Sequence, residues 1–153
     1  MQTIAGTSNR ILDVNLSEQT SQILRINDDD RRRYLGGKGL GLKLINERLS
    51  VGVDPLGPDN LLVFMMGVMM GTGAPCSGRF AALTKSPLTG IMLASSCGGP
   101  FGMALKTAGY DGLIVGGRSQ APVYLRIEAA GATIEDAAPL WGLNTLETQQ
   151  RLN

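Results

Sequence analysis

The 153-residue sequence contains no histidine and only two cysteines, Cys76 and Cys97. The absence of histidine excludes His-based general acid–base catalysis, Ser–His or Cys–His nucleophilic catalysis, and metal sites with His ligands. Two cysteines cannot supply the four thiolates of a structural zinc or iron–sulfur site, and their spacing indicates no disulfide framework. We therefore predict no catalytic residue and no metal-ligand set in this chain.

Net charge and long apolar runs are also nearly absent. Fourteen Lys and Arg residues face thirteen Asp and Glu residues, so no global field attracts nucleic acid or an anionic membrane. The longest apolar stretch, residues 61–70, is interrupted by Gly67 and is far shorter than the roughly 20 residues of a spanning helix. The N-terminus lacks the charged and apolar regions of a targeting segment. We expect a cytoplasmic protein that binds neither nucleic acid nor membrane.

Hydrophobic periodicity predicts an α+β protein. A hairpin is expected over residues 10–16 and 21–26, followed by a charged helix start in which acids 28–30 precede Arg31, Arg32 and Arg33 in a solvated first turn. Helices are predicted at 39–49 and 101–108, and strands at 61–66, 80–84, 90–94, 113–115, 123–127 and 132–135.

A last helix is predicted from the capping box that Asn144 forms with Glu147 three residues later. The chain reaches Asn153 after only two or three turns of this helix. We expect residues 1–153 to form a single domain that is truncated near its C-terminal end.

Residues 60–110 contain no Asp or Glu, although the average of this chain would place about four there. The same segment holds nine glycines and three isolated cations, Arg79, Lys85 and Lys106. Glycines allow backbone to approach a ligand, and donors without competing carboxylates suit an anion. The segment thus favours a phosphate-binding surface, with a glycine-rich core segment as the alternative.

Three glycine-rich loops refine this hypothesis. Residues 71–79 end in Arg79, residues 95–99 open a helix, and residues 36–41 (GGKGLG) form a third cluster. The third cluster lacks the G-x-G-x-x-G spacing of dinucleotide sites, and no P-loop pattern occurs. Six of the seven methionines lie in the middle segment, where we expect them to fill the core.

The motifs resemble, in order and spacing, the N-terminal domain of the aldehyde ferredoxin oxidoreductases. The similarity runs from about Arg10 to the C-terminus through these segments: 34–41 (YLGGKGLG), 53–60 (VDPLGPDN), 71–75 (GTGAP), 77–80 (SGRF), 84–90 (TKSPLTG), 98–102 (GGPFG), 108–112 (AGYDG), 122–124 (PVY) and 140–142 (LWG).

The resemblance implies a fold of two packed, mainly antiparallel β-sheets with flanking helices. Family enzymes carry tungsten or molybdenum on two pyranopterins bridged by magnesium, together with a [4Fe–4S] cluster. They oxidise aldehydes to carboxylic acids and pass electrons to ferredoxin. In such an enzyme the cluster ligands would lie outside this chain, which would cradle the cofactor. Its partners would be the remaining domains, ferredoxin or a similar carrier, and a second copy in a homodimer.

Three residues match cofactor-binding positions of the family. Arg79 matches an arginine that contacts the pterin cofactor, as guanidinium geometry suits phosphate. Ser96 replaces the usual asparagine near the bridging magnesium, where either a backbone carbonyl or a side chain would act. Gly98 matches a glycine whose backbone lies against the cofactor. Lys85 and residues 71–75 are assigned to loop geometry rather than to ligand binding.

The resulting hypothesis is a cofactor-binding domain of a tungsten or molybdenum oxidoreductase, inactive as an isolated 153-residue piece. One alternative is a stand-alone, non-catalytic module that binds or assembles a pterin or another phosphorylated ligand. A second is a structural role in which the acid-free surface meets another subunit. The metal, the substrate and the roles of Cys76 and Cys97 stay open.

Overall fold

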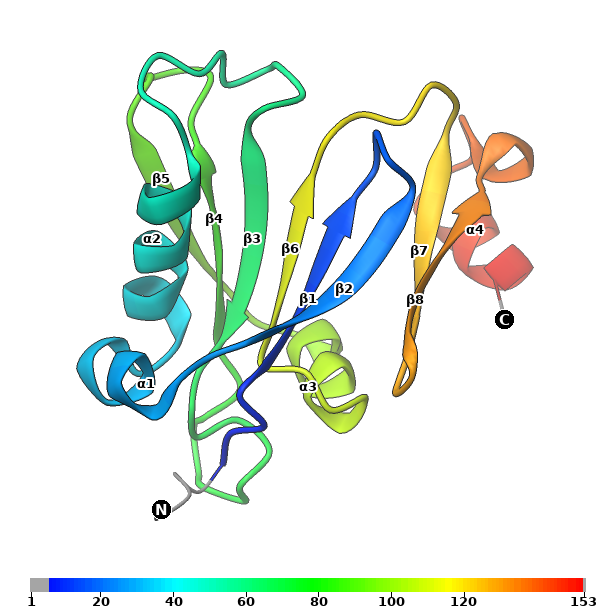
Figure 1. Cartoon of the computed structure of the whole chain (residues 1–153). Helices are drawn as coiled ribbons and strands as arrows, with labels where there is room; N and C mark the ends of the chain where they lie inside the picture. Colours follow the sequence, from blue (N-terminus) through cyan, green and yellow to red (C-terminus); the bar gives the residue numbers. More distant parts are fainter. Residues whose placement is uncertain (1–5, 153) are drawn as a thin grey trace.

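A computed structural model describes residues 6–152 of the chain. Figure 1 shows helices and strands in an α+β arrangement. The helices are α1 (Asp28–Tyr34), α2 (Gly37–Arg48), α3 (Pro100–Thr107), the 3-10 helix η1 (Ala138–Leu140) and α4 (Thr145–Leu152). The strands are β1 (Arg10–Asn15), β2 (Thr20–Arg25), β3 (Leu61–Met66), β4 (Phe80–Lys85), β5 (Met92–Cys97), β6 (Gly112–Gly116), β7 (Val123–Glu128) and β8 (Gly131–Asp136).

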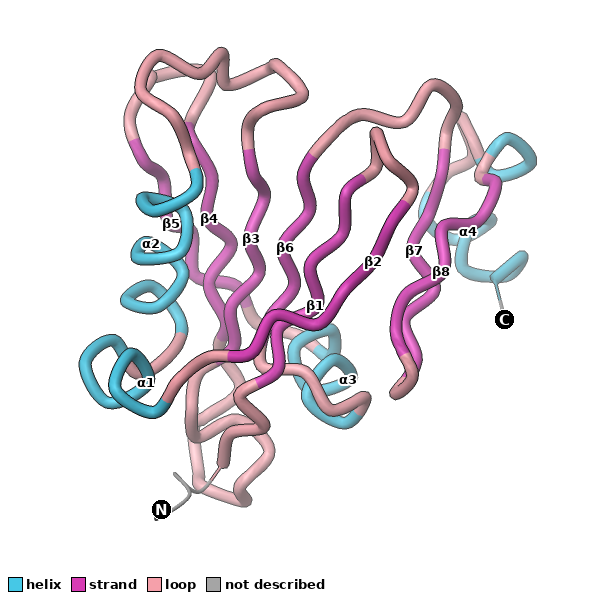
Figure 2. The backbone as a smooth tube through the Cα atoms, in the orientation of Figure 1, coloured by secondary structure: helices cyan, strands magenta, loops and turns pink. Residues whose placement is uncertain are grey.

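The strands of the described chain form two sheets (Figure 2). Six strands pair in the order β2-β1-β6-β3-β4-β5, and β7 pairs with β8 in a separate hairpin. Strands β1 and β6 run parallel, while the other neighbours run antiparallel. The expected α+β class with two mainly antiparallel sheets and flanking helices is confirmed.

Each face of the six-stranded sheet is covered by different elements. Helix α2 packs on one face through Leu40, Leu44 and Ile45, which are buried against strand residues such as Val63. The close approach of helix and sheet depends on Gly41, because a Cβ at this position would lie 2.6 Å from Cδ1 of Leu83. The opposite face packs against α3 and the β7–β8 hairpin, with these buried residues: Leu12, Val14, Met66, Met70, Phe80, Leu105, Tyr110 and Leu113.

Local sequence signals account for many of these elements. The hairpin expected at residues 10–16 and 21–26 is confirmed as β1 and β2. The capping box of α4 is also confirmed, because the Glu147 amide donates to Oδ1 of Asn144 at 2.9 Å and the Asn144 amide donates to Oε2 of Glu147 at 3.3 Å. The expectation that six methionines fill the core is only half right: Met65, Met66 and Met70 are buried, whereas Met69, Met92 and Met103 are exposed.

Three of the expected boundaries, two of strand β5 and one of helix α2, were wrong. Strand β5 begins at Met92, not Gly90, because Gly90 has φ +71° and donates its amide to the Ser86 carbonyl in a closing turn. The strand then continues through Cys97 by pairing with β4, so residues 95–97 of the loop expected before α3 belong to a strand. Helix α2 begins two residues earlier than expected, at Gly37.

The described part of the chain holds no helix that is both long enough and apolar enough to cross a membrane.

Candidate functional site

A surface pocket of about 200 Å³ lies where α2 begins, β4 begins and β5 ends. These three points meet at the same end of the six-stranded sheet (Figure 1). Residues from all three elements line the pocket, and none of them is acidic: Gly37, Lys38, Arg79, Phe80, Ala81, Ala94, Ser95 and Ser96. An acid-free pocket with two cations suits an anionic ligand.

The N-terminus of α2 contributes unpaired backbone donors to this pocket. Its N-cap is Gly36, no side chain caps the helix, and the first turn contains no acid. The first N–H groups of a helix have no partner within the helix, and the helix dipole places partial positive charge there. Gly37 and Lys38 of this first turn line the pocket. A phosphate or other anion would satisfy these donors.

The glycine cluster at residues 36–41 is explained by close packing around this turn. A Cβ on Gly36 would lie 2.6 Å from the Met66 carbonyl oxygen, and one on Gly39 would lie 2.5 Å from that of Tyr34. Both distances are too short for any side chain, so these positions require glycine. The cluster therefore brings the start of α2 against the end of β3.

The structure brings the three predicted site residues together. Ser96 lies opposite Ala81 in the β4–β5 ladder, and Arg79 directly precedes β4. Gly98 follows β5, and a Cβ on it would lie 3.9 Å from Cδ and Nε of Arg79. The side chains of Arg79, Ser96 and Lys38 are exposed, and none has a hydrogen-bond or ion-pair partner among residues 6–152.

The other two cations of the acid-free segment are already occupied. The Lys85 ammonium donates to the Val53 carbonyl, which agrees with its assignment to loop geometry. The Lys106 ammonium donates to Oδ1 of Asp111 at 2.7 Å and to the Gly6 carbonyl at 2.6 Å. Arg79 is therefore the cation of this segment that is available for a ligand.

Sequence reasoning missed a buried ionic network next to this region. Arg31, expected in a solvated helix turn, is only 1% exposed, and its Nη2 donates to Oδ2 of Asp111 at 2.8 Å. Burial lowers the pKa of the Arg31 guanidinium, and the Asp111 carboxylate partly offsets this effect. The only sequence signal was that Asp111 is the first carboxylate after the acid-free segment. Its partner Arg31 lies 80 positions away, so no local pattern could reveal the pair.

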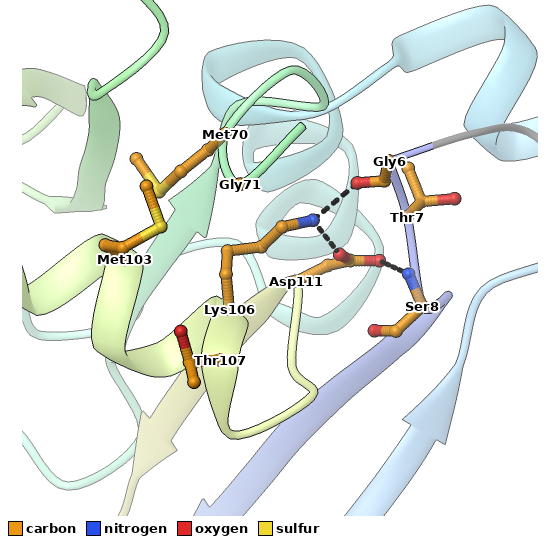
Figure 3. A pocket seen from close by; sticks show the side chains of 9 residues that line it. All are labelled: Gly6, Thr7, Ser8, Met70, Gly71, Met103, Lys106, Thr107 and Asp111. Atoms are coloured by element: carbon orange, nitrogen blue, oxygen red, sulfur yellow. Dashed lines mark hydrogen bonds and ion pairs between the residues drawn. The ribbon is translucent and has the colours of Figure 1, made fainter. Parts of the chain in front are cut away.

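Lys106 and Asp111 also line a second cavity of about 350 Å³, shown in Figure 3. Residues of α3, of the loop after β3 and of the N-terminal segment surround it: Gly6, Thr7, Ser8, Met70, Gly71, Met103, Lys106, Thr107 and Asp111. Its one ammonium already donates to the Asp111 carboxylate and to the Gly6 carbonyl, so this cavity offers an anion less than the pocket beside Arg79 does.

Together with the fold, the acid-free pocket places an uncapped helix start and the Arg79 guanidinium at one end of the six-stranded sheet. The family described as "Aldehyde ferredoxin oxidoreductase, N-terminal domain" matches residues 11–153, and the chain belongs to this family. The resemblance seen in the sequence is therefore confirmed.

Individual relatives agree with this assignment. The tungsten-containing aldehyde ferredoxin oxidoreductase of Pyrococcus horikoshii is 39% identical over 147 residues, which cover 96% of this chain and 24% of that protein. The aliphatic sulfonate oxidoreductase, WOR-like subunit, of Pyrococcus furiosus is 33% identical over 146 residues, covering 94% of this chain and 23% of that protein.

Among solved structures, the active-site complex BamBC of benzoyl-coenzyme A reductase with 1,5-dienoyl-CoA matches with a TM-score of 0.92 and 34% identity. The match covers 97% of this chain and 23% of that one. The chain thus spans about a quarter of the length of these relatives and has the fold of their N-terminal part.

Proposed function

We propose that this chain is the part of a larger oxidoreductase that binds the phosphate end of a tungsten or molybdenum bis-pyranopterin cofactor. The observation that carries the proposal is the convergence of Arg79, Lys38 and the uncapped N-terminus of α2 on one pocket without acidic residues. All three are unpaired donors or cations, and phosphate oxygens satisfy such groups well.

The size of the pocket fits part of such a cofactor. Its volume of about 200 Å³ lies below the roughly 300–1,000 Å³ that enclose a whole drug-sized ligand. The pocket therefore suits a phosphate group, while the ring systems would extend over neighbouring surface. Further parts of a longer enzyme would have to enclose them.

The conformation of Gly98 supports a ligand over this surface. Its φ is not in the left-handed region, and a Cβ would meet only the Arg79 side chain, in ordinary contact at 3.9 Å. Neither the fold nor the packing within the described chain requires glycine here. A cofactor lying against the backbone would require it.

The relatives differ in the substrates that their names state: an aldehyde, an aliphatic sulfonate and benzoyl-coenzyme A. A domain shared by enzymes with different substrates is expected to serve what the enzymes have in common. Cofactor binding is such a shared task, whereas substrate recognition is not.

In the proposed enzyme the cofactor supplies the redox chemistry when it is bound, and this chain binds and orients it. Arg79 and the first turn of α2 would hold phosphate, and Gly98 would allow close approach of the backbone. Ser96 would lie near the bridging magnesium, through its hydroxyl or its backbone carbonyl. Aldehyde oxidation, a [4Fe–4S] cluster ligated outside this chain, ferredoxin as acceptor and a homodimer belong to the same proposal, as does a cytoplasmic location.

The test is Arg79→Ala in the full-length enzyme, with pterin and metal content measured per polypeptide. Arg32→Ala is the matched control, because Arg32 is an exposed arginine on α1 that does not line the pocket. We expect lower pterin and metal content for Arg79→Ala and unchanged content for Arg32→Ala. Unchanged content in both variants would refute the assigned role of Arg79.

A further inference from the structure

The turn that leads into α2 is held by a buried side chain. Nη1 of Arg31 donates to the Leu35 carbonyl at 2.8 Å, and Nε donates to Oδ1 of Asn9 at 3.0 Å. Leu35 has φ +58°, an unfavourable conformation for a residue other than glycine. Its carbonyl immediately precedes Gly36 and Gly37, which start α2. The contact therefore fixes the start of α2, whose first turn lines the acid-free pocket beside Arg79, called the phosphate pocket below.

Asp111 in turn fixes Arg31. Its Oδ2 accepts from Nη2 of Arg31 at 2.8 Å and from the amides of Ser8 and Asn9 at 3.0 and 2.8 Å. Its Oδ1 accepts from the Lys106 ammonium. Figure 3 shows the contacts of Asp111 with Lys106 and Ser8. Asp111 is 2% exposed, and four donors restrict its carboxylate to one orientation.

The backbone carbonyl of Asp111 is also linked to this turn, through Met66. The Met66 amide donates to the Asp111 carbonyl at 2.9 Å, at the end of β3. The Met66 carbonyl in turn packs so closely on Gly36 that a Cβ there would lie 2.6 Å away. The start of α2 is thus tied to Asp111 both through the Arg31 side chain and through the end of β3.

We propose that Arg31 and Asp111 are positioning residues for the phosphate pocket. Neither lines the pocket; they hold the first turn of α2 so that its N–H groups and Lys38 face Arg79 and Ser96. A turn rich in glycine has large conformational freedom, and ordering it on binding would weaken the affinity. The buried pair orders it before the ligand arrives. This inference rests on the proposed cofactor-binding function.

The test compares Arg31→Lys with Arg48→Lys in the full-length, cofactor-loaded enzyme. A lysine at position 31 keeps a cation for Asp111, but one ammonium cannot also reach Leu35 and Asn9. Arg48 is a matched control, because it forms a 2.8 Å ion pair with Asp13 at the other end of α2. The rate at which pterin is released from the protein is measured by filtration. Each variant is held at a temperature that lies the same number of degrees below its own thermal unfolding midpoint.

We expect Arg31→Lys to release pterin about tenfold faster than the wild type. The reason is the loss of the charge-assisted hydrogen bond to the Leu35 carbonyl, which holds the turn. Arg48→Lys should release it at the wild-type rate. Equal rates for the two variants would overturn the positioning role. If Arg79→Ala also leaves pterin content unchanged, the proposed function itself fails; if Arg79→Ala lowers it, only the positioning role fails.

A measurement on the wild-type enzyme keeps the proposal testable if Arg31→Lys does not fold. The amides of Ser8 and Asn9 are bonded to Asp111, and those of Gly41 and Leu42 are the first amides whose helical partner carbonyls lie within α2. We expect hydrogen exchange of all four to show the same opening free energy and urea dependence. Opening of Gly41 and Leu42 at a lower free energy than Ser8 and Asn9 would overturn the proposal.

Discussion

Replacing Asp111 by Asn should destabilise the protein far more than an ordinary loss of one ion pair. Arg31 and Lys106 both donate to this carboxylate, and their side chains are only 1% and 11% exposed. Asn keeps the shape of the side chain but leaves the two cations without a counter-charge. Removing one partner of a buried ion pair typically costs about 3–5 kcal/mol, a large share of the roughly 5–15 kcal/mol that stabilises a native protein.

Asp13→Asn is the matched control for this substitution. Asp13 is 8% exposed, but its partner Arg48 is 36% exposed and can be solvated when the carboxylate is lost. We expect a loss of about 1 kcal/mol there. Urea unfolding of both variants, followed by circular dichroism, gives the two free energies of unfolding. A loss for Asp111→Asn no larger than that for Asp13→Asn would refute the view that the network is held together by buried charge.

Three further predictions concern other residues and the isolated chain. Gly98→Ala should fold normally but lower cofactor content, whereas Gly41→Ala should lower the thermal midpoint because its Cβ would meet Leu83 at 2.6 Å; the reverse pattern would contradict both assignments. The Lys43 ammonium lowers the pKa of Asp30, mainly through a side-chain hydrogen bond, so this contact stabilises the fold above the ordinary Asp pKa and is lost as pH falls through the lowered value. Lys43→Met should therefore raise the Asp30 pKa measured by NMR and reduce the acid-range loss of stability, and an unchanged Asp30 pKa would count against the pair. The purified 153-residue chain should not reduce a viologen dye with an aldehyde, and measurable reduction would show that aldehyde oxidation does not depend on further domains.

Local patterns in the sequence predicted many elements correctly. The polar turn between the two strand-like runs at residues 10–16 and 21–26 marks a hairpin, although β1 is buried on both faces and β2 is largely exposed. The apolar spacing of Leu40, Leu44 and Ile45 marks the buried face of α2. The reciprocal capping of Asn144 and Glu147 is likewise a contact between near neighbours. Such signals are short-range, so they are visible without the tertiary structure.

Features set by long-range contacts could not be predicted from patterns. The end of β5 at Cys97 depends on its pairing with Phe80, and the sequence around Ser96 resembles a polar loop. The burial of Arg31 depends on Asp111 in a distant element. The requirement for glycine at position 36 comes from the Met66 carbonyl, not from a nucleotide. The resemblance to the family identified Arg79, Ser96 and Gly98 as candidates, but not the turn of α2 that faces them.

The central claim is that the pocket formed by Arg79 and the first turn of α2 holds a phosphate of the cofactor. A crystal structure of the full-length, metal-loaded enzyme tests it most directly. We expect a cofactor phosphate oxygen about 2.7–2.9 Å from the Arg79 guanidinium, with the N–H groups of Gly37 or Lys38 directed at the same phosphate. A cofactor bound without contact to Arg79 or to the start of α2, for example in the cavity beside Lys106, would contradict the account.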